Sequence, residues 1–194
     1  MSLKDKLQAR RAKEHKLRKH RDLLLQSIRT HLLPAFIQQG FSVTPQVHSG
    51  PVDRKTVDIF PFGLLRRTRP DGGVDLVEIQ FMTYQRAAFR INACVVPKEG
   101  MMTLGGQRTA DQLQAGGLHD HFVMYAYPKS QTWFSLWFWR FRTPVQSDYD
   151  KLVLRVTGFL PEVDLALREG KLGPHMRHVV IPIHNEEQIP ATPY

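Results

Sequence analysis

The segments VDLVEIQF (residues 74–81) and AFRINACVV (residues 88–96) decide how this sequence folds. Both are rich in residues that favour strands, and the short link between them makes antiparallel pairing the natural choice. A turn centred near Gln85 places Phe81 opposite Phe89. In that register every apolar residue on this face meets an apolar partner, so we predict an amphipathic hairpin with one face in the core.

The other face of the predicted hairpin gathers four polar side chains. The same register places Gln80 beside Arg90 and Glu78 beside Asn92. A polar sheet face of this kind is either solvated or in contact with a partner. We keep both interpretations open, and the second makes these four residues candidate binding residues.

Outward from the hairpin, the sequence predicts an α+β fold. We expect an antiparallel β-sheet of about five strands, packed against an N-terminal helix and a C-terminal helical pair. The other expected strands cover residues 56–65, 122–127 and 133–141, with a short one at 178–183. The expected helices cover residues 3–39, interrupted near Pro34, 109–114, 147–158 and 161–169. The 194 residues suit a single α+β domain with a loose C-terminal tail over residues 184–194.

The net charge of +9 is concentrated at the N-terminus. Residues 1–30 hold ten Lys or Arg against three acidic residues, a net charge of +7, whereas the other 164 residues hold 17 and 15. We predict a basic helical arm over residues 1–21, which contacts nucleic acid or another partner or is a solvated or oligomer-docking extension. It has too few apolar residues to lie on a membrane. The candidate contact residues are Arg10, Arg11, Lys13, Lys16, Arg18, Lys19 and Arg21.

The run WFSLWFW (residues 133–139) has the most unusual local composition of the chain. As a strand it places Trp133, Trp137 and Trp139 on one face. One interpretation is a central strand covered on both sides. The other is a tryptophan platform for a peptide, base or sugar ring, beside which Arg140 suits an anionic ligand.

One arrangement suggests an enzyme. Asp58 on one predicted strand, with Glu78 and Gln80 on the next, resembles the acidic pattern of PD-(D/E)xK nucleases. Such sites hold a divalent cation with carboxylates and use a lysine to help orient the attacking water. Gln80 stands where the lysine is needed. A divergent metal-dependent nuclease or nucleic-acid-binding protein is therefore the alternative, and we expect a non-enzymatic protein without catalytic residues.

The sequence contains no other catalytic or cofactor motif. It has no phosphate-binding glycine loop and no serine or cysteine nucleophile motif. The pairs His119 with His121 and His175 with His178 supply two ligands each, so we expect neither a metal nor a cofactor. We expect Cys94 to be a buried hydrophobe. Without a long apolar run or a signal peptide, we expect no membrane span and a cytoplasmic location.

The order of elements resembles the bacterial DUF4304-like family, catalogued as a domain of unknown function. The resemblance rests on a helix leading into Gly40-Phe41, the strand ending VEIQ (77–80), the strand FRIN (89–92) and the helical pair after Asp148, and it covers residues 22–170. The long basic arm and the extended middle of this chain depart from that pattern. The resemblance implies an α+β fold with no established activity. We therefore expect a bacterial binding or regulatory protein with a protein or nucleic-acid partner. An immunity-type role is one of the roles that would fit such a protein.

Overall fold

The computed structural model describes residues 3–44, 54–83, 86–103, 106–136 and 143–181. Within them, seven strands form an antiparallel sheet in the order β1-β2-β3-β4-β7-β9, with β8 also paired to β4. In chain order the elements are α1 (Leu3–Ser27), the π-helical turn η1 (Ile28–Leu32), α2 (Leu33–Gln38), β1 (Ser42–Thr44), α3 (Arg54–Ile59), β2 (Leu64–Thr68), β3 (Val74–Phe81), β4 (Ala88–Val96), β5 (Met101–Thr103), β6 (Gly106–Arg108), the 3-10 turns η2 (Ala110–Gln112) and η3 (Ala115–Gly117), β7 (Asp120–Met124), β8 (Phe134–Ser135), α4 (Gln146–Thr157), α5 (Leu160–Glu169) and β9 (Met176–Val180). The α+β class, the N-terminal helix and the C-terminal helical pair are confirmed.

The hairpin of β3 and β4 has the predicted bounds and the predicted register. Phe81 lies opposite Phe89, and Glu78 lies opposite Asn92. The pattern of apolar residues fixes this register, because a slip by one residue would turn the buried side chains to the wrong face.

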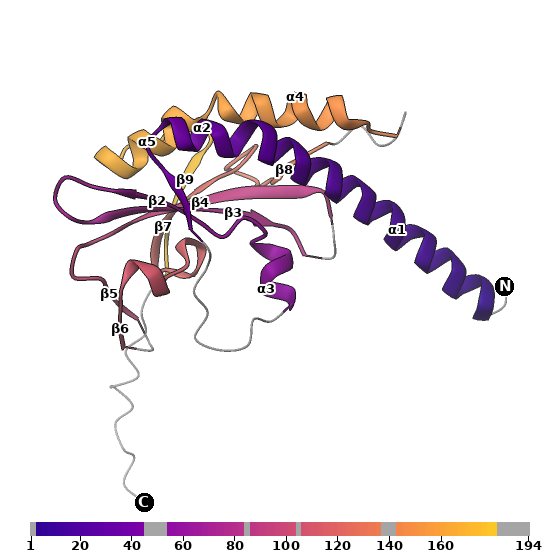
Figure 1. Cartoon of the computed structure of the whole chain (residues 1–194), viewed down its shortest axis with the longest axis horizontal. Helices are drawn as coiled ribbons and strands as arrows, with labels where there is room; N and C mark the ends of the chain where they lie inside the picture. The colour runs from indigo at the N-terminus through magenta and orange to yellow at the C-terminus, as the bar shows by residue number, and fades with distance from the viewer. Residues whose placement is uncertain (1–2, 45–53, 84–85, 104–105, 137–142, 182–194) are drawn as a thin grey trace, which may run out of the picture.

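The N-terminal and C-terminal helices cover one face of the sheet, and short segments cover the other. Figure 1 shows α1, α2, α4 and α5 on one side, and β5, β6 and the 3-10 turns on the opposite side. On the helical side, Leu24, Ile28 and Phe36 pack with Val153 of α4 in the larger core, and all four are fully buried. A smaller core lies on the other side, where Cys94 is buried as expected.

The N-terminal helix passes Pro34 without a break. The backbone widens into the π-helical turn η1, in which the N–H of Leu33 donates to the carbonyl of Ile28. Pro34 then lies in the first turn of α2, where its missing N–H leaves no carbonyl of that helix unpaired. The interruption expected near Pro34 is therefore a local change of hydrogen bonding.

Two predicted strands are wrong in extent. Residues 54–59 form the helix α3, and a turn with Pro61 and a positive φ at Gly63 separates it from β2. This turn prevents one continuous strand over residues 56–65. The strand expected over 133–141 is, in the described part of the chain, only the two residues of β8. Trp137, Trp139, Arg140 and the predicted C-terminal tail lie outside the described residues.

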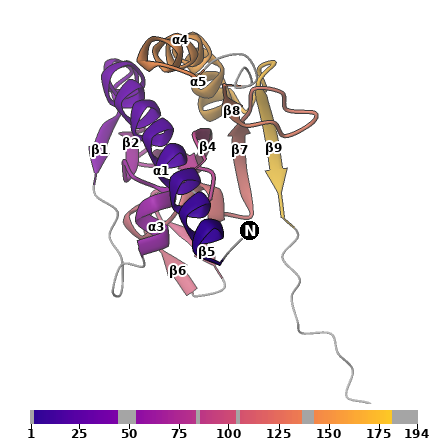
Figure 2. The same cartoon turned by 90° about the vertical axis from the view of Figure 1, so that its right-hand side faces the viewer.

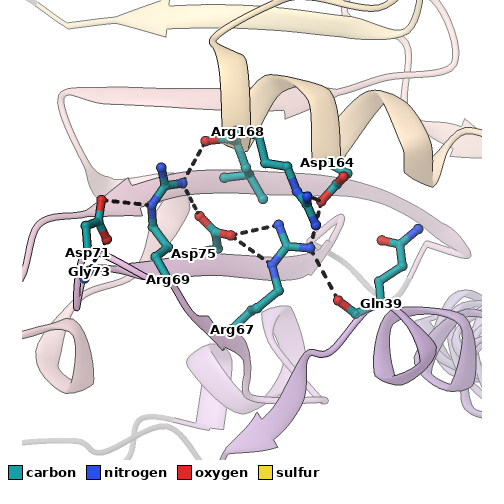
Figure 3. A network of polar contacts seen from close by, with 9 residues as sticks. Gln39, Arg67, Arg69, Asp71, Gly73, Asp75, Asp164 and Arg168 are labelled. Atoms are coloured by element: carbon teal, nitrogen blue, oxygen red, sulfur yellow. Dashed lines mark hydrogen bonds and ion pairs between the residues drawn. The ribbon is translucent and has the colours of Figure 1, made fainter.

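A buried charge network joins the helical layer to the strands β2 and β3 (Figure 3). The carboxylate of Asp75 on β3 is almost fully buried and accepts two hydrogen bonds from Arg67, at 2.9 and 2.7 Å, and one from Arg69 at 2.8 Å. Arg67 also pairs with Asp164 of α5 at 2.6 Å, and Arg69 donates to the carbonyl of Leu167 at 2.9 Å. Both arginines therefore connect the strands to α5.

Candidate nucleic-acid interface

The four polar residues predicted for the sheet face do come together, but as an enclosed network. The side-chain oxygen of Gln80 accepts hydrogen bonds from Arg90 Nε at 2.8 Å and from Asn92 Nδ2 at 2.9 Å. Glu78 and Asn92 are fully buried, whereas Gln80 and Arg90 are half-buried. The expected solvated face is therefore wrong at Glu78 and Asn92.

The turn η3 encloses the inner end of this network. The N–H of Gly116 donates to Glu78 Oε2 at 3.0 Å. Burial raises the pKa of Glu78 to about 7, although the backbone N–H groups of Gly116 and Ala115, the Asn92 amide and the charge of Arg90 all favour the carboxylate. Within the described residues, Glu78 Oε1 and Asn92 Oδ1 have no hydrogen-bond partner. The site thus holds a carboxyl group that carries a proton more readily than an exposed one does.

The outer end of the network leads to an aromatic ring. Arg90 donates to the hydroxyl of Tyr125 at 2.8 Å, and its guanidinium lies over the ring of Trp133, 4.9 Å from the centroid. The sequence reasoning did not find Tyr125. Tyr125 lies near the end of the strand predicted at 122–127, and this position is the only sign of it in the sequence. The sequence does not show that this strand lies beside β4, which follows from the order of strands in the sheet.

The structure does not assemble the nuclease-like pattern. Asp58 lies on the helix α3 and is exposed, and its backbone carbonyl accepts a hydrogen bond from Arg21. Glu78 is enclosed by η3 instead. In the described part of the chain, no group of three or more His, Cys, Asp or Glu is arranged to hold a metal ion.

Three of the four histidines of the two predicted pairs contact a carbonyl or a carboxylate within the described residues. His121 Nδ1 lies 2.8 Å from the carbonyl of Leu118, and burial lowers the pKa of His121. His175 Nδ1 lies 2.7 Å from Glu162, and His178 Nε2 lies 2.6 Å from Asp120.

The basic arm projects from the body as the first part of α1 (Figures 1 and 2). His20 and Arg21 are buried, so the exposed surface of the arm ends at Lys19. Arg21 packs over the ring of Phe81 at 4.7 Å, and burial lowers its pKa. Arg21 is therefore part of the body, unlike the exposed Lys6, Arg10, Arg11, Lys16, Arg18 and Lys19. The side chains of Lys4 and Lys13 are outside the described set.

An open pocket of about 440 Å³ lies at the base of the arm. Leu17 of α1 forms one wall. The end of the β3–β4 hairpin and the segment around β8 form the others, through residues that include Met82, Arg86, Thr132, Trp133 and Ser135. Phe134 points into the main core, whereas its neighbour Trp133 is half-buried at this pocket. In the described part of the aromatic run, the core interpretation therefore holds at Phe134, and the platform interpretation stays a prediction.

Comparison with protein-family models, curated proteins and solved structures finds no match to this chain. The family resemblance therefore stays a prediction. Among the described helices, none combines the length and apolar character needed to cross a membrane.

Proposed function

We propose that this chain is a non-enzymatic protein that binds nucleic acid through its basic arm. One observation carries the proposal: Lys6, Arg10, Arg11, Lys16, Arg18 and Lys19 are all exposed on a helix that extends beyond the body. Clustered exposed Lys and Arg attract the phosphate backbone, which supplies most non-specific affinity for nucleic acid.

The distribution of charge along the arm favours phosphates as the bound groups. At 3.6 residues per turn, the six exposed side chains point to all sides of the helix instead of forming a single stripe. Within the described arm side chains, Glu14 pairs with Arg10 at 2.9 Å, a surface contact that contributes little to stability. Such a helix offers cationic contacts around its whole circumference. This arrangement suits a flexible single strand, or a duplex whose groove the helix enters.

The polar sheet face does not serve as the macromolecular contact in this proposal. Glu78 and Asn92 are fully buried under η3, and Gln80 is already bonded to Arg90 and Asn92. A macromolecule could reach Glu78 and Asn92 only if η3 moved away from the sheet. The enclosed network instead supports residues at its outer end.

Salt-dependent binding tests this function. Fluorescence anisotropy with labelled DNA and RNA should show binding at low salt that weakens linearly on a log–log scale as salt rises. The triple variant Lys16→Gln, Arg18→Gln, Lys19→Gln should bind at least tenfold more weakly. The slope should shrink by roughly 0.9 for each lost phosphate contact on duplex DNA.

The matched control removes three exposed basic residues from the body, as Lys98→Gln, Lys129→Gln, Lys151→Gln. It changes the net charge by the same amount and should keep most of the affinity. Equal weakening by the two triple variants would mean that only total charge matters. An absence of binding at low salt would refute the proposed function.

A further inference from the structure

We infer that the pocket at the base of the arm holds an unpaired nucleobase against Trp133, so that the partner is single-stranded nucleic acid. This inference rests on the proposed function and specifies its ligand. The arm binds the phosphates, and the pocket binds one base.

The position of the pocket joins the two kinds of contact. Leu17 lies in its wall, and the exposed Lys16 and Arg18 are its immediate neighbours on the arm. Arg86, at the end of the hairpin, also lines the pocket and is exposed. A base inside the pocket would therefore have cationic side chains near its flanking phosphates.

The pocket has the composition of a site for a flat ring. Its lining is mainly apolar, and Thr132 and Ser135 add hydroxyl groups that can bond the edge of a base. The volume of about 440 Å³ lies within the range of small-ligand pockets. Stacking of bases on aromatic side chains tolerates any base, because every base has a π face.

The buried network gives Trp133 a fixed support. Arg90 lies over the indole ring and is held by Gln80 and by the hydroxyl of Tyr125. Asn92 in turn donates to Gln80. The half-buried residues Gln80 and Arg90 thus position the side chain of Trp133.

Single strands fit this arrangement better than duplexes or acidic proteins. The bases of a duplex are stacked and paired, and extracting one costs unpairing energy. An acidic peptide would match the charge of the arm. However, an indole ring backed by a guanidinium group is suited to stack a planar ring instead of a carboxylate.

Four ligands of matched charge test the inference with the wild-type chain: a labelled dT15 strand, an abasic strand with the same phosphates, a shorter duplex with the same total number of phosphates, and poly-glutamate of the same charge. We expect dT15 to bind about tenfold more tightly than the abasic strand. Trp133→Leu should remove this preference and leave the abasic strand bound as before. The arm triple variant should weaken binding of all three nucleic acids.

A second variant, Leu17→Ala, tests the same pocket in case Trp133→Leu does not fold. Leu17→Ala changes the wall of the pocket from the arm side, away from the sheet, and should reduce the preference for dT15 severalfold. A strand containing 2-aminopurine should lose fluorescence on binding the wild type, because stacking quenches this base. Both variants should show weaker quenching, with circular dichroism spectra like that of the wild type.

The outcomes separate this inference from the proposed function. Equal binding of dT15, abasic strand and duplex, lost in the arm triple variant, would overturn the base pocket and leave the arm as a phosphate contact. A preference for dT15 that survives in both Trp133→Leu and Leu17→Ala would also overturn it. Binding to poly-glutamate alone would refute both.

Discussion

At the scale of single residues, Glu78 makes the stability of the fold depend on pH. Its pKa in the folded chain is about 7, above the usual value of 4.5 for a glutamate side chain, because the carboxyl group is desolvated. Between these two values the folded chain binds more protons than the unfolded one, so the free energy of unfolding falls as pH rises through this window. The full effect is about 3 kcal/mol, and stability is greatest while Glu78 is protonated.

The variant Glu78→Gln isolates this effect, because its side chain keeps the shape without the titration. We expect the wild type to lose about 3 kcal/mol relative to the variant between pH 4.5 and pH 8. Urea unfolding at a series of pH values measures the difference. A difference that stays constant with pH would show that Glu78 has an ordinary pKa.

The sequence predicted which residues of the site are neighbours, but not how deeply they are buried. Strand alternation and register placed Gln80 beside Arg90 and Glu78 beside Asn92, because both depend only on local pairing. The burial of Glu78 and Asn92 depends on Gly116, which is almost 40 residues from Glu78 in the sequence. Hydrophobic periodicity does not predict the hydrogen bond from Gly116 to Glu78. Arg21 was misplaced on the arm surface for the same reason: its partner Phe81 is distant in sequence.

At the scale of elements, the turn η3 fits the sheet only because residue 116 is glycine. A Cβ atom there would collide with the amide of Asn92, whereas one at Gly117 would meet only Gln114, at 3.9 Å. Gly116→Ala should therefore destabilise the chain by about 1–3 kcal/mol, through displaced packing above Glu78.

Gly117→Ala is the matched control and should change stability by no more than about 0.5 kcal/mol. Chemical denaturation of the two variants tests the fit. Equal effects would indicate that alanine acts through the backbone of the turn, not through contact with Asn92.

Elements with strong local signals were predicted well, and those fixed by distant contacts were not. β3, β4 and the C-terminal helices match because their periodicity and caps lie within the segment itself. β1 and β9 are edge strands that depend on a neighbour for pairing, and β9 starts two residues earlier than the predicted strand at 178–183. α3 was missed because its apolar residues Val57 and Ile59 also suit a strand.

At the scale of the whole molecule, the charge network around Asp75 connects the sheet to α5. Removal of one member of a buried pair leaves uncompensated charge, which is strongly destabilising. We expect Asp75→Asn to lower the free energy of unfolding by roughly 3 kcal/mol. Asp71→Asn is the control, because Asp71 pairs with the same Arg69 at 3.5 Å but is exposed. Similar losses in the two variants, measured by urea unfolding, would contradict a special role for burial.

The continuity of α1 has a thermodynamic consequence for any ligand of the arm. The same helix that packs Leu24 in the core extends outward to Leu3, so the packed half supplies the costly nucleus for the exposed half. A basic tail without structure must give up conformational entropy when it binds, whereas this arm has already given it up during folding. A ligand bound to the arm would therefore be held at a fixed distance and angle relative to the sheet.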